Sequence, residues 1–294
     1  MLRIGPIGFR IGADWRAPID RLRALYAGYP APPDGLPDYN VRLEATRPWR
    51  RLVRPSVAIA GDYMLADAAP LPLAHALLAA EMAMNLQVAL GERRFLLLHA
   101  ATVERDGRAV VLTGESGAGK STLAALMALR GWRLMGDEFA LIDPATGLLH
   151  AFPRLVSLKN AAIAVVRAAA PAGRFGPLLA GTPKGDIRHL VPDAAAVAAM
   201  DRPAMPACLV FPRFGFAAEQ RCVGAGEAFV RLTQASTNYV ALGERGFAAL
   251  TAFVGAVPAC AIDYPDAEAG IAMIEAMTGA ATGATTGAAT GAVG

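Results

Sequence analysis

The sequence predicts an α/β fold that leans towards α+β, with a mixed, hairpin-rich sheet around one phosphate-binding loop. Residues Gly114–Ser121 complete the pattern G-x-x-x-x-G-K-[ST], between an apolar strand at Ala109–Leu112 and a helix at Thr122–Leu129. The neighbouring strands follow one another through tight turns, such as the one at Asp106-Gly107. A doubly wound nucleotide-binding sheet would instead alternate strands and helices throughout.

Three regions divide the chain. Residues 1–70 contain short strands and one helix of their own, which predicts a small N-terminal α+β lobe that covers the nucleotide domain. Residues 71–277 contain the phosphate-binding motif and are predicted to form the catalytic domain. Residues 278–294 are a Gly/Ala/Thr repeat that cannot bury a core, so we expect a disordered tail.

The order of elements follows from hydrophobic periodicity and from turn signals. Strands are predicted at 2–12, 39–46, 56–60, 95–99, 102–104, 108–112, 132–135, 139–142, 148–152, 206–211 and 260–264. Helices are predicted at 15–28, 71–91, 122–129, 225–234, 243–257 and 266–277. The stretches 29–38 and 170–184 are rich in proline and glycine and are predicted to be loops.

Composition limits the classes of partner. Of the 294 residues, 54% are hydrophobic and the net charge is only +3, without a dense Lys/Arg stripe, so we expect no nucleic-acid partner. The apolar helix at 71–91 contains polar side chains, which favours a buried helix over a membrane span. The start of the chain lacks the apolar core of a secretory signal. Three scattered cysteines fit reduced thiols, so we expect a cytoplasmic protein without a membrane partner.

The phosphate-binding motif predicts an ATP and Mg²⁺ site. Its glycines let successive backbone N–H groups point at phosphate oxygens, and the next helix presents its N-terminus to the same anion. Lys120 can reach the β- and γ-phosphates, and the Ser121 hydroxyl can bind Mg²⁺. The predicted nucleotide-binding residues are Gly114, Glu115, Ser116, Gly117, Ala118, Gly119, Lys120, Ser121 and Thr122.

Two carboxylates follow the next apolar strand. Asp137 and Glu138 can divide the work, one binding Mg²⁺ and the other accepting a proton from an attacking hydroxyl, and the spacing leaves open which does which. His99 ends an earlier strand that the hairpin should bring close to the motif. It can orient the acidic pair or contact the transferred phosphate, or it can be a structural strand-end residue.

Together, His99, the P-loop (Gly114–Ser121) and the block RGWRLMGDE at Arg130–Glu138 resemble the catalytic domain of HPr kinase/phosphorylase. The stretches FPRLVSLKN (Phe152–Asn160) and VFPRF (Val210–Phe214) are similar to those of HPr kinase-related proteins that are encoded with peptide-modification or exopolysaccharide genes. The resemblance implies a serine kinase with a P-loop fold akin to phosphoenolpyruvate carboxykinase. It also implies a homo-oligomer, because the parent family forms rings of six.

The resemblance assigns roles to individual residues. Lys120 would bind phosphates and Ser121 would bind Mg²⁺. Glu138 would be the general base, assisted by His99, and Asp137 would help to place metal and water. Two positions depart from the family pattern, which has Asp-Asp at 137–138 and glycine where this chain has Ala100. The family's later glutamate ligand and its phosphorylase loop have no recognisable counterpart, so reverse phosphorolysis and HPr itself are not assigned.

Two further cations are candidates. Lys184 lies in a glycine-flanked loop that can close over a phosphate, and Arg213 follows a strand and can stabilise charge on the transferred group. Either can equally be an ordinary surface cation. The sequence therefore predicts an ATP-dependent kinase that transfers the γ-phosphoryl to a hydroxyl, that of a serine in a protein or peptide. The alternatives are a small-molecule kinase or carboxykinase-like phosphotransferase, and a nucleotide-sensing protein without turnover.

Overall fold

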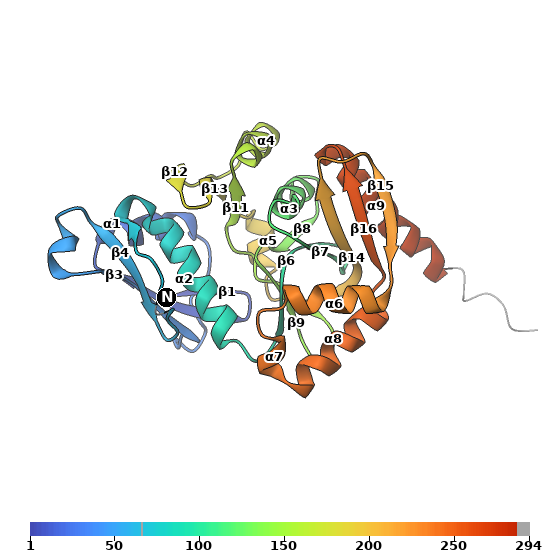
Figure 1. Cartoon of the computed structure of the whole chain (residues 1–294), viewed down its shortest axis with the longest axis horizontal. Coiled ribbons are helices and arrows are strands. Elements are labelled where there is room, and N and C mark those ends of the chain that lie inside the picture. Colours follow the sequence, from blue (N-terminus) through green and yellow to red (C-terminus); the bar gives the residue numbers. More distant parts are fainter. Residues whose placement is uncertain (66, 287–294) are drawn as a thin grey trace, which may run out of the picture.

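Three β-sheets organise the computed structural model, which describes residues 1–65 and 67–286 (Figure 1). The first has five strands in the order β1-β2-β3-β4-β5. The second has eight strands, in the order β10-β9-β6-β7-β14-β16-β15 with β8 paired to β6, and the third has the order β11-β13-β12. Parallel and antiparallel pairs occur in the same sheets, which confirms a mixed α/β fold.

The N-terminal sheet and its helices make up the first part of the chain. The elements are β1 (Leu2–Ile4), β2 (Ile7–Ala13), α1 (Arg16–Leu25), β3 (Tyr39–Ala45), η1 (Pro48–Arg51), β4 (Ser56–Gly61), β5 (Leu71–Pro72), η2 (Leu73–His75) and α2 (Ala76–Gly91). Helix α2, which the sequence analysis grouped with the catalytic region, packs on β3 and β4 (Figure 1). Residues 73–91 are long and apolar enough to cross a membrane by composition, but 56% of the apolar window is buried inside the protein.

The eight-stranded sheet is built around one long strand. Its first elements are β6 (Leu96–Arg105), β7 (Arg108–Thr113), α3 (Lys120–Ala128), β8 (Arg133–Gly136), β9 (Phe139–Ile142) and β10 (Leu149–His150). The sequence analysis predicted two short strands at 95–99 and 102–104, whereas β6 is continuous because β7, β8 and β9 all pair with it. The hairpin at Asp106-Gly107 is confirmed, with φ of 54° and 78° at its two turn residues.

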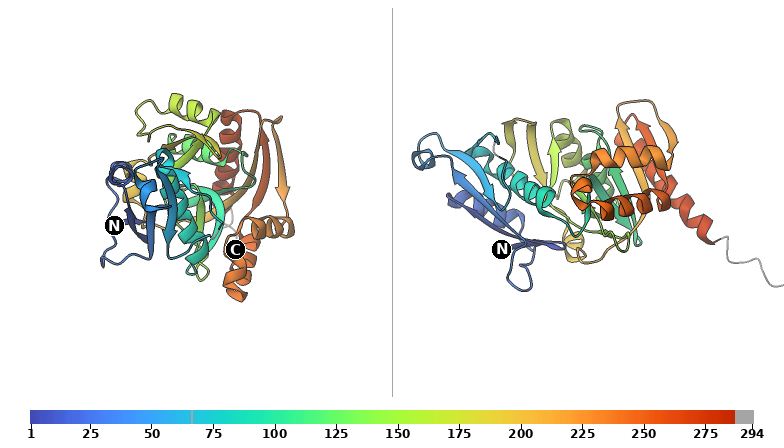
Figure 2. Two further views of the ribbon diagram at one scale, coloured as in Figure 1. Left: turned by 60° about the vertical axis from the view of Figure 1, so that its left-hand side comes forward. Right: turned by 60° about the horizontal axis from the view of Figure 1, so that its bottom comes forward.

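The second half of the chain completes this sheet. The elements are β11 (Val156–Lys159), α4 (Ala161–Ala169), β12 (Leu179–Thr182), β13 (Gly185–Leu190), α5 (Ala194–Ala198), β14 (Met205–Phe214), β15 (Glu219–Val223), α6 (Ala225–Ala235), α7 (Tyr239–Leu242), α8 (Glu244–Ala256), β16 (Ala259–Tyr264) and α9 (Ala267–Thr286). Strand β14 is parallel to both β7 and β16, and β15 is an antiparallel edge strand. Helices α3 and α9 bury one face of the sheet, and α6 and α8 bury the other (Figure 2).

Two predicted boundaries are corrected. The stretch 170–184, expected to be a loop, includes β12, which pairs with β13. Helix α9 continues past Met277 to Thr286, because the alanine-rich repeat retains enough helix propensity to extend a helix already anchored on the sheet. The rest of the predicted tail, 287–294, lies outside the described residues.

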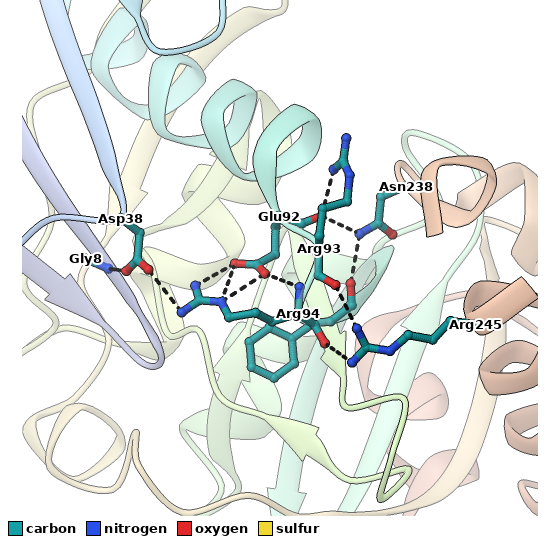
Figure 3. A network of polar contacts seen from close by, with 8 residues as sticks. Gly8, Asp38, Glu92, Arg93, Arg94, Asn238 and Arg245 are labelled. Atoms are coloured by element: carbon teal, nitrogen blue, oxygen red, sulfur yellow. Dashed lines mark hydrogen bonds and ion pairs between the residues drawn. The ribbon is translucent and has the colours of Figure 1, made fainter. Parts of the chain in front are cut away.

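The segment that joins α2 to β6 is held from both sides (Figure 3). Buried Glu92 accepts hydrogen bonds from the backbone and guanidinium of Arg94, and Arg94 also pairs with Asp38 of the N-terminal part at 3.0 Å. From the other side, the Asn238 amide donates to the carbonyls of Glu92 and Phe95 at 3.0 and 2.8 Å. These contacts connect the two parts of the chain close to the start of β6.

A buried ion pair makes a second connection. Arg154, between β10 and β11, is only 2% exposed, and its guanidinium donates to Glu81 and Asn85 of α2. The Tyr26 hydroxyl donates to the same Glu81 carboxylate at 2.9 Å, and the Tyr29 hydroxyl donates to the carbonyl of Pro153 at 2.6 Å. Because both charges are removed from water, each depends on the other.

Replacement of Arg154 by methionine tests this connection. We expect the free energy of unfolding of Arg154→Met to fall by about 3–5 kcal/mol, because Glu81 is left buried without its counter-charge. Urea denaturation measures the loss. The control is Arg16→Met, whose exposed pair with Asp20 should contribute less than about 1 kcal/mol. Equal losses in the two variants would contradict the interpretation.

Candidate functional site

The P-loop lies between β7 and α3, and its last glycine has no room for a side chain unless Tyr264 moves. Gly119 precedes α3 with φ of 92°, a conformation that residues with a side chain rarely adopt. The Tyr264 hydroxyl occupies the space that a Cβ of Gly119 would need, and it donates to the carbonyl of Ala118 at 2.8 Å. Tyr264 of β16 thus packs against the P-loop and stabilises its backbone at Ala118 and Gly119.

Lys120 is buried at the start of α3 with 7% of its surface exposed. Its Nζ donates to the carbonyls of Gly114 and Glu115 at 2.7 and 2.9 Å, so the loop itself satisfies the ammonium. Burial lowers the pKa of Lys120, while the charges of Asp137 and Glu138 oppose the change. The lysine therefore lies within electrostatic reach of both acids.

Asp137 lies in the turn between β8 and β9 and is 4% exposed. Its Oδ2 accepts from the backbone N–H of Ser157 at 3.1 Å, while Oδ1 is buried without a partner of good geometry. Burial raises the pKa of Asp137 to about 6, and Glu138 adds to the rise, whereas hydrogen bonding by Ser121 and Ser157 opposes it. An orphaned carboxylate oxygen beside a serine hydroxyl is a set of donors that suits a hard divalent cation.

Glu138 and His99 face each other across the β6–β9 pairing. The backbone N–H of Ala100 donates to the carbonyl of Glu138 at 3.3 Å, and His99 pairs with Phe139. This places His99 Nδ1 at 3.7 Å from Glu138 Oε2, a charge contact rather than a short hydrogen bond. Burial lowers the pKa of His99 from 6.5, so the imidazole is neutral at pH 7 and can accept a proton.

The structure adds Lys159, which is not among the candidate cations named from the sequence. This residue ends β11, and its charge acts on His99, Lys120 and Asp137. The sequence signal for its position is the alternation of buried residues in β11. Val156 and Leu158 are buried, so Ser157 and Lys159 share the other face of the strand. The backbone N–H of Ser157 donates to Asp137. Lys159 is therefore a second lysine whose charge acts on Asp137.

A cleft of about 1180 Å³ opens beside His99 and the P-loop, while Lys120, Asp137, Glu138 and Lys159 are not part of its lining. His99, Thr113 and the first half of the P-loop line one part, and residues of β14, β15, β16 and α6 line the rest. Arg213 belongs to this lining: its guanidinium pairs with Asp263 and lies 4.1 Å from the centre of the Phe216 ring. Arg221 and Arg231, which the sequence analysis did not single out, line the same cleft.

The structure does not bring Lys184 to the cleft. It is exposed in the turn between β12 and β13, and its charge is not among those that act on His99, Lys120 or Asp137. The β12–β13 hairpin packs against η2 instead, where the His75 ring forms a hydrogen bond with the carbonyl of Ala180 at 2.9 Å. Among the predicted site residues, the structure thus groups the P-loop, His99, Asp137, Glu138 and Arg213, and leaves Lys184 aside.

Within 1–65 and 67–286, no group of three or more His, Cys, Asp and Glu side chains could hold a metal ion by itself. The three cysteines are free thiols, although Cys222 and Cys260 lie opposite each other across β15 and β16. A cation at Asp137 would thus need ligands of another kind, such as the Ser121 hydroxyl, phosphate oxygens and water.

Comparisons with known proteins give limited likenesses. A family profile described as the SynChlorMet cassette protein ScmC matches residues 74–173, about a third of the chain. Comparison with curated proteins finds no match. Among solved structures, the chain is similar to the Hpr(Ser) kinase/phosphatase from Coxiella burnetii, with 11% identity and a TM-score of 0.29, over 66% of this chain and 99% of that one. A similarity this low supports no statement about function, so any assignment of function rests on the residues of the site.

The raised pKa of Asp137 predicts a pH-dependent difference in stability. Its folded pKa of about 6 lies above the ordinary value of 3.8, so the stabilisation by its proton is complete below pH 4 and is lost as pH rises through 6. We expect the stability of Asp137→Asn, relative to wild type, to increase by about 3 kcal/mol over this interval. Urea denaturation across the pH range, without nucleotide or metal, measures this. Parallel profiles would show that Asp137 titrates normally.

Proposed function

We propose that the chain is an ATP-dependent phosphotransferase that transfers the γ-phosphoryl to a hydroxyl, that of a serine in a protein or peptide. The observation that carries the proposal is the convergence of a complete P-loop, a buried Asp137, a partly exposed Glu138 and a neutral histidine on neighbouring strands of one sheet. A loop that only holds phosphate does not require a carboxylate and an imidazole beside it.

In this proposal the loop binds the donor. Backbone N–H groups of Gly114–Thr122 and the N-terminus of α3 receive the phosphate oxygens. Lys120 already points into the loop and exchanges its contacts with the Gly114 and Glu115 carbonyls for the β- and γ-phosphates. Ser121 and Asp137 would hold Mg²⁺, which would neutralise charge on the phosphates when bound.

The proton of the attacking hydroxyl goes to Glu138. Its carboxylate is partly exposed, with 26% of the side chain open, whereas Asp137 is enclosed and has its Oδ2 bound to Ser157. Glu138 is therefore the carboxylate that an acceptor can approach. His99, at 3.7 Å, keeps the Glu138 carboxylate oriented and can take up the proton after transfer.

Two cations act on the transferred group. Lys159 approaches from β11, on the side of the acidic pair, and Arg213 approaches from β14, on the side of the cleft. Phosphoryl transfer spreads negative charge over the equatorial oxygens, and fixed cations stabilise that charge without further reorganisation.

The size of the cleft favours a large acceptor. Small-molecule sites usually occupy about 300–1,000 Å³, and this cleft of about 1180 Å³ reaches beyond the P-loop to α6 and the sheet edge. A nucleotide would fill only the part beside the loop. The remainder suits a peptide or protein segment better than an enclosed metabolite.

Transfer of label from γ-³²P-ATP tests the proposal. We expect the wild type to label a protein or peptide in size-fractionated lysate of the source organism. Lys120→Ala should lose both ATP binding and labelling, because no other cation takes its place in the loop. Glu138→Gln should keep ATP binding and lose at least about 100-fold in transfer, because the amide cannot accept a proton.

Three other outcomes would revise the proposal. Full transfer by Glu138→Gln would remove the general-base role. Label only in small molecules would make the chain a metabolite kinase. ATP binding with no transfer in any fraction would favour a nucleotide sensor.

The two remaining lysines provide a matched pair. We expect Lys159→Met to lower kcat by about 10²–10³-fold, because it removes a fixed charge from the reacting group. Lys184→Met should keep wild-type kcat, because Lys184 is exposed on the β12–β13 turn and its charge is not among those that act on His99, Lys120 or Asp137. Steady-state kinetics with the labelled acceptor measures both. Equal losses, or a loss in Lys184→Met alone, would contradict the assignment of Lys159.

A further inference from the structure

The connection between β3 and β4 gathers positive charge and apolar surface at one turn. Residues 46–55 read TRPWRRLVRP, with four arginines and no acidic residue. We call residues 46–55 the arginine turn. It lies at the left-hand end of the molecule in Figure 1, and the elements that line the cleft lie further to the right.

Backbone contacts hold the arginine turn in shape. The Trp15 indole donates to the carbonyl of Arg51 at 2.9 Å, and the Arg50 guanidinium donates to the carbonyl of Arg54 at 3.1 Å. At its base, the hydroxyls of Thr46 and Ser56 lie 2.7 Å apart. These contacts fix the backbone of the turn at Arg51 and Arg54 and at its base.

The apolar side chains of the arginine turn are exposed to solvent. Trp49, Leu52 and Val53 are 55%, 85% and 62% exposed. The guanidinium of Arg47 lies 5.2 Å from the centre of the Trp49 ring, so cation and aromatic side chain share one surface. Three large exposed apolar side chains on one ten-residue turn are costly in water and usually mark a contact surface.

The arginines carry charge that the protein does not neutralise. Within residues 1–65 and 67–286, Arg47, Arg50, Arg51 and Arg54 make no ion pair. Glu44, two residues before the turn, already pairs with Arg42 at 3.0 Å, and Asp14, which accepts from the N–H of Ala45, lies 3.6 Å from the same guanidinium. The whole-chain charge of +3 hides this cluster, which explains why composition pointed to no charged partner.

We propose that the arginine turn binds an anionic phospholipid surface. Arginines attract the headgroups, and a tryptophan with aliphatic neighbours on a protruding turn can enter the headgroup boundary. Trp49, Leu52 and Val53 are exposed on one turn of the chain together with four arginines, so a membrane surface that meets this turn finds apolar and cationic side chains together. The expectation of no membrane partner is thereby revised, and the proposed phosphotransferase activity is not needed for it.

Sedimentation with vesicles tests the proposal on the full chain. We expect binding to phosphatidylcholine vesicles that contain phosphatidylglycerol and none to phosphatidylcholine alone, with affinity falling as salt rises. Arg51→Glu/Arg54→Glu should lose at least about tenfold in affinity, since both side chains are exposed and unpaired. Arg167→Glu/Arg202→Glu changes the net charge equally at exposed positions elsewhere and should bind like wild type. Circular dichroism checks that each variant is folded.

The apolar side chains distinguish lipid from other anions. We expect Trp49→Ala/Leu52→Ser to weaken vesicle binding most at high salt, where the charge attraction is screened. Unchanged vesicle binding in this variant, together with arginine-dependent binding to DNA or to an acidic peptide, would replace the lipid by an acidic macromolecule. Absence of wild-type binding, or equal losses in both charge variants, would overturn the proposal outright. None of these results depends on ATP turnover.

Discussion

The pairing of β6 with three other strands is the constraint on which the site depends. β7 runs along one edge of β6, and β8 and β9 pair with successive parts of the other edge. The end of β7 leads into the P-loop, and the turn between β8 and β9 carries Asp137 and Glu138. His99 lies in β6 between them. A shift of register by one residue would turn His99 to the other face of the sheet and separate it from Glu138.

Among the residues that the structure describes, two charged groups of the site have no partner of opposite charge in direct contact. Lys120 is satisfied by carbonyls of its own loop, while Asp137 retains a buried oxygen without a partner and a raised pKa. Phosphate and a cation would resolve both conditions together. The N-terminal part contributes as well, because Arg154 is fixed by Glu81 of α2 and its charge acts on Glu138. We infer that removal of that part would disturb the acidic pair.

Sequence reasoning located the segments of the site where the signal was local. The P-loop, the turn at Asp106-Gly107 and the acidic pair after an apolar strand each occupy a few consecutive residues. It failed where packing between distant segments decides. Helix α2 looks like any apolar helix until its contacts with β3 and β4 are known. Lys159 is brought to the site because β11 runs beside Asp137. Lys184 lies away from the site because the β12–β13 hairpin packs against η2.

The most direct test of the central claim is the chemistry of the labelled product. Wild-type protein and γ-³²P-ATP are incubated with the fractionated lysate, and the labelled material is then subjected to acid hydrolysis and phosphoamino-acid separation. A general base beside a P-loop predicts an acid-stable phosphate ester on serine that is absent with Lys120→Ala. Acid-labile label, as on histidine or a carboxylate, would contradict a hydroxyl acceptor. The absence of any wild-type-dependent label would contradict transfer itself.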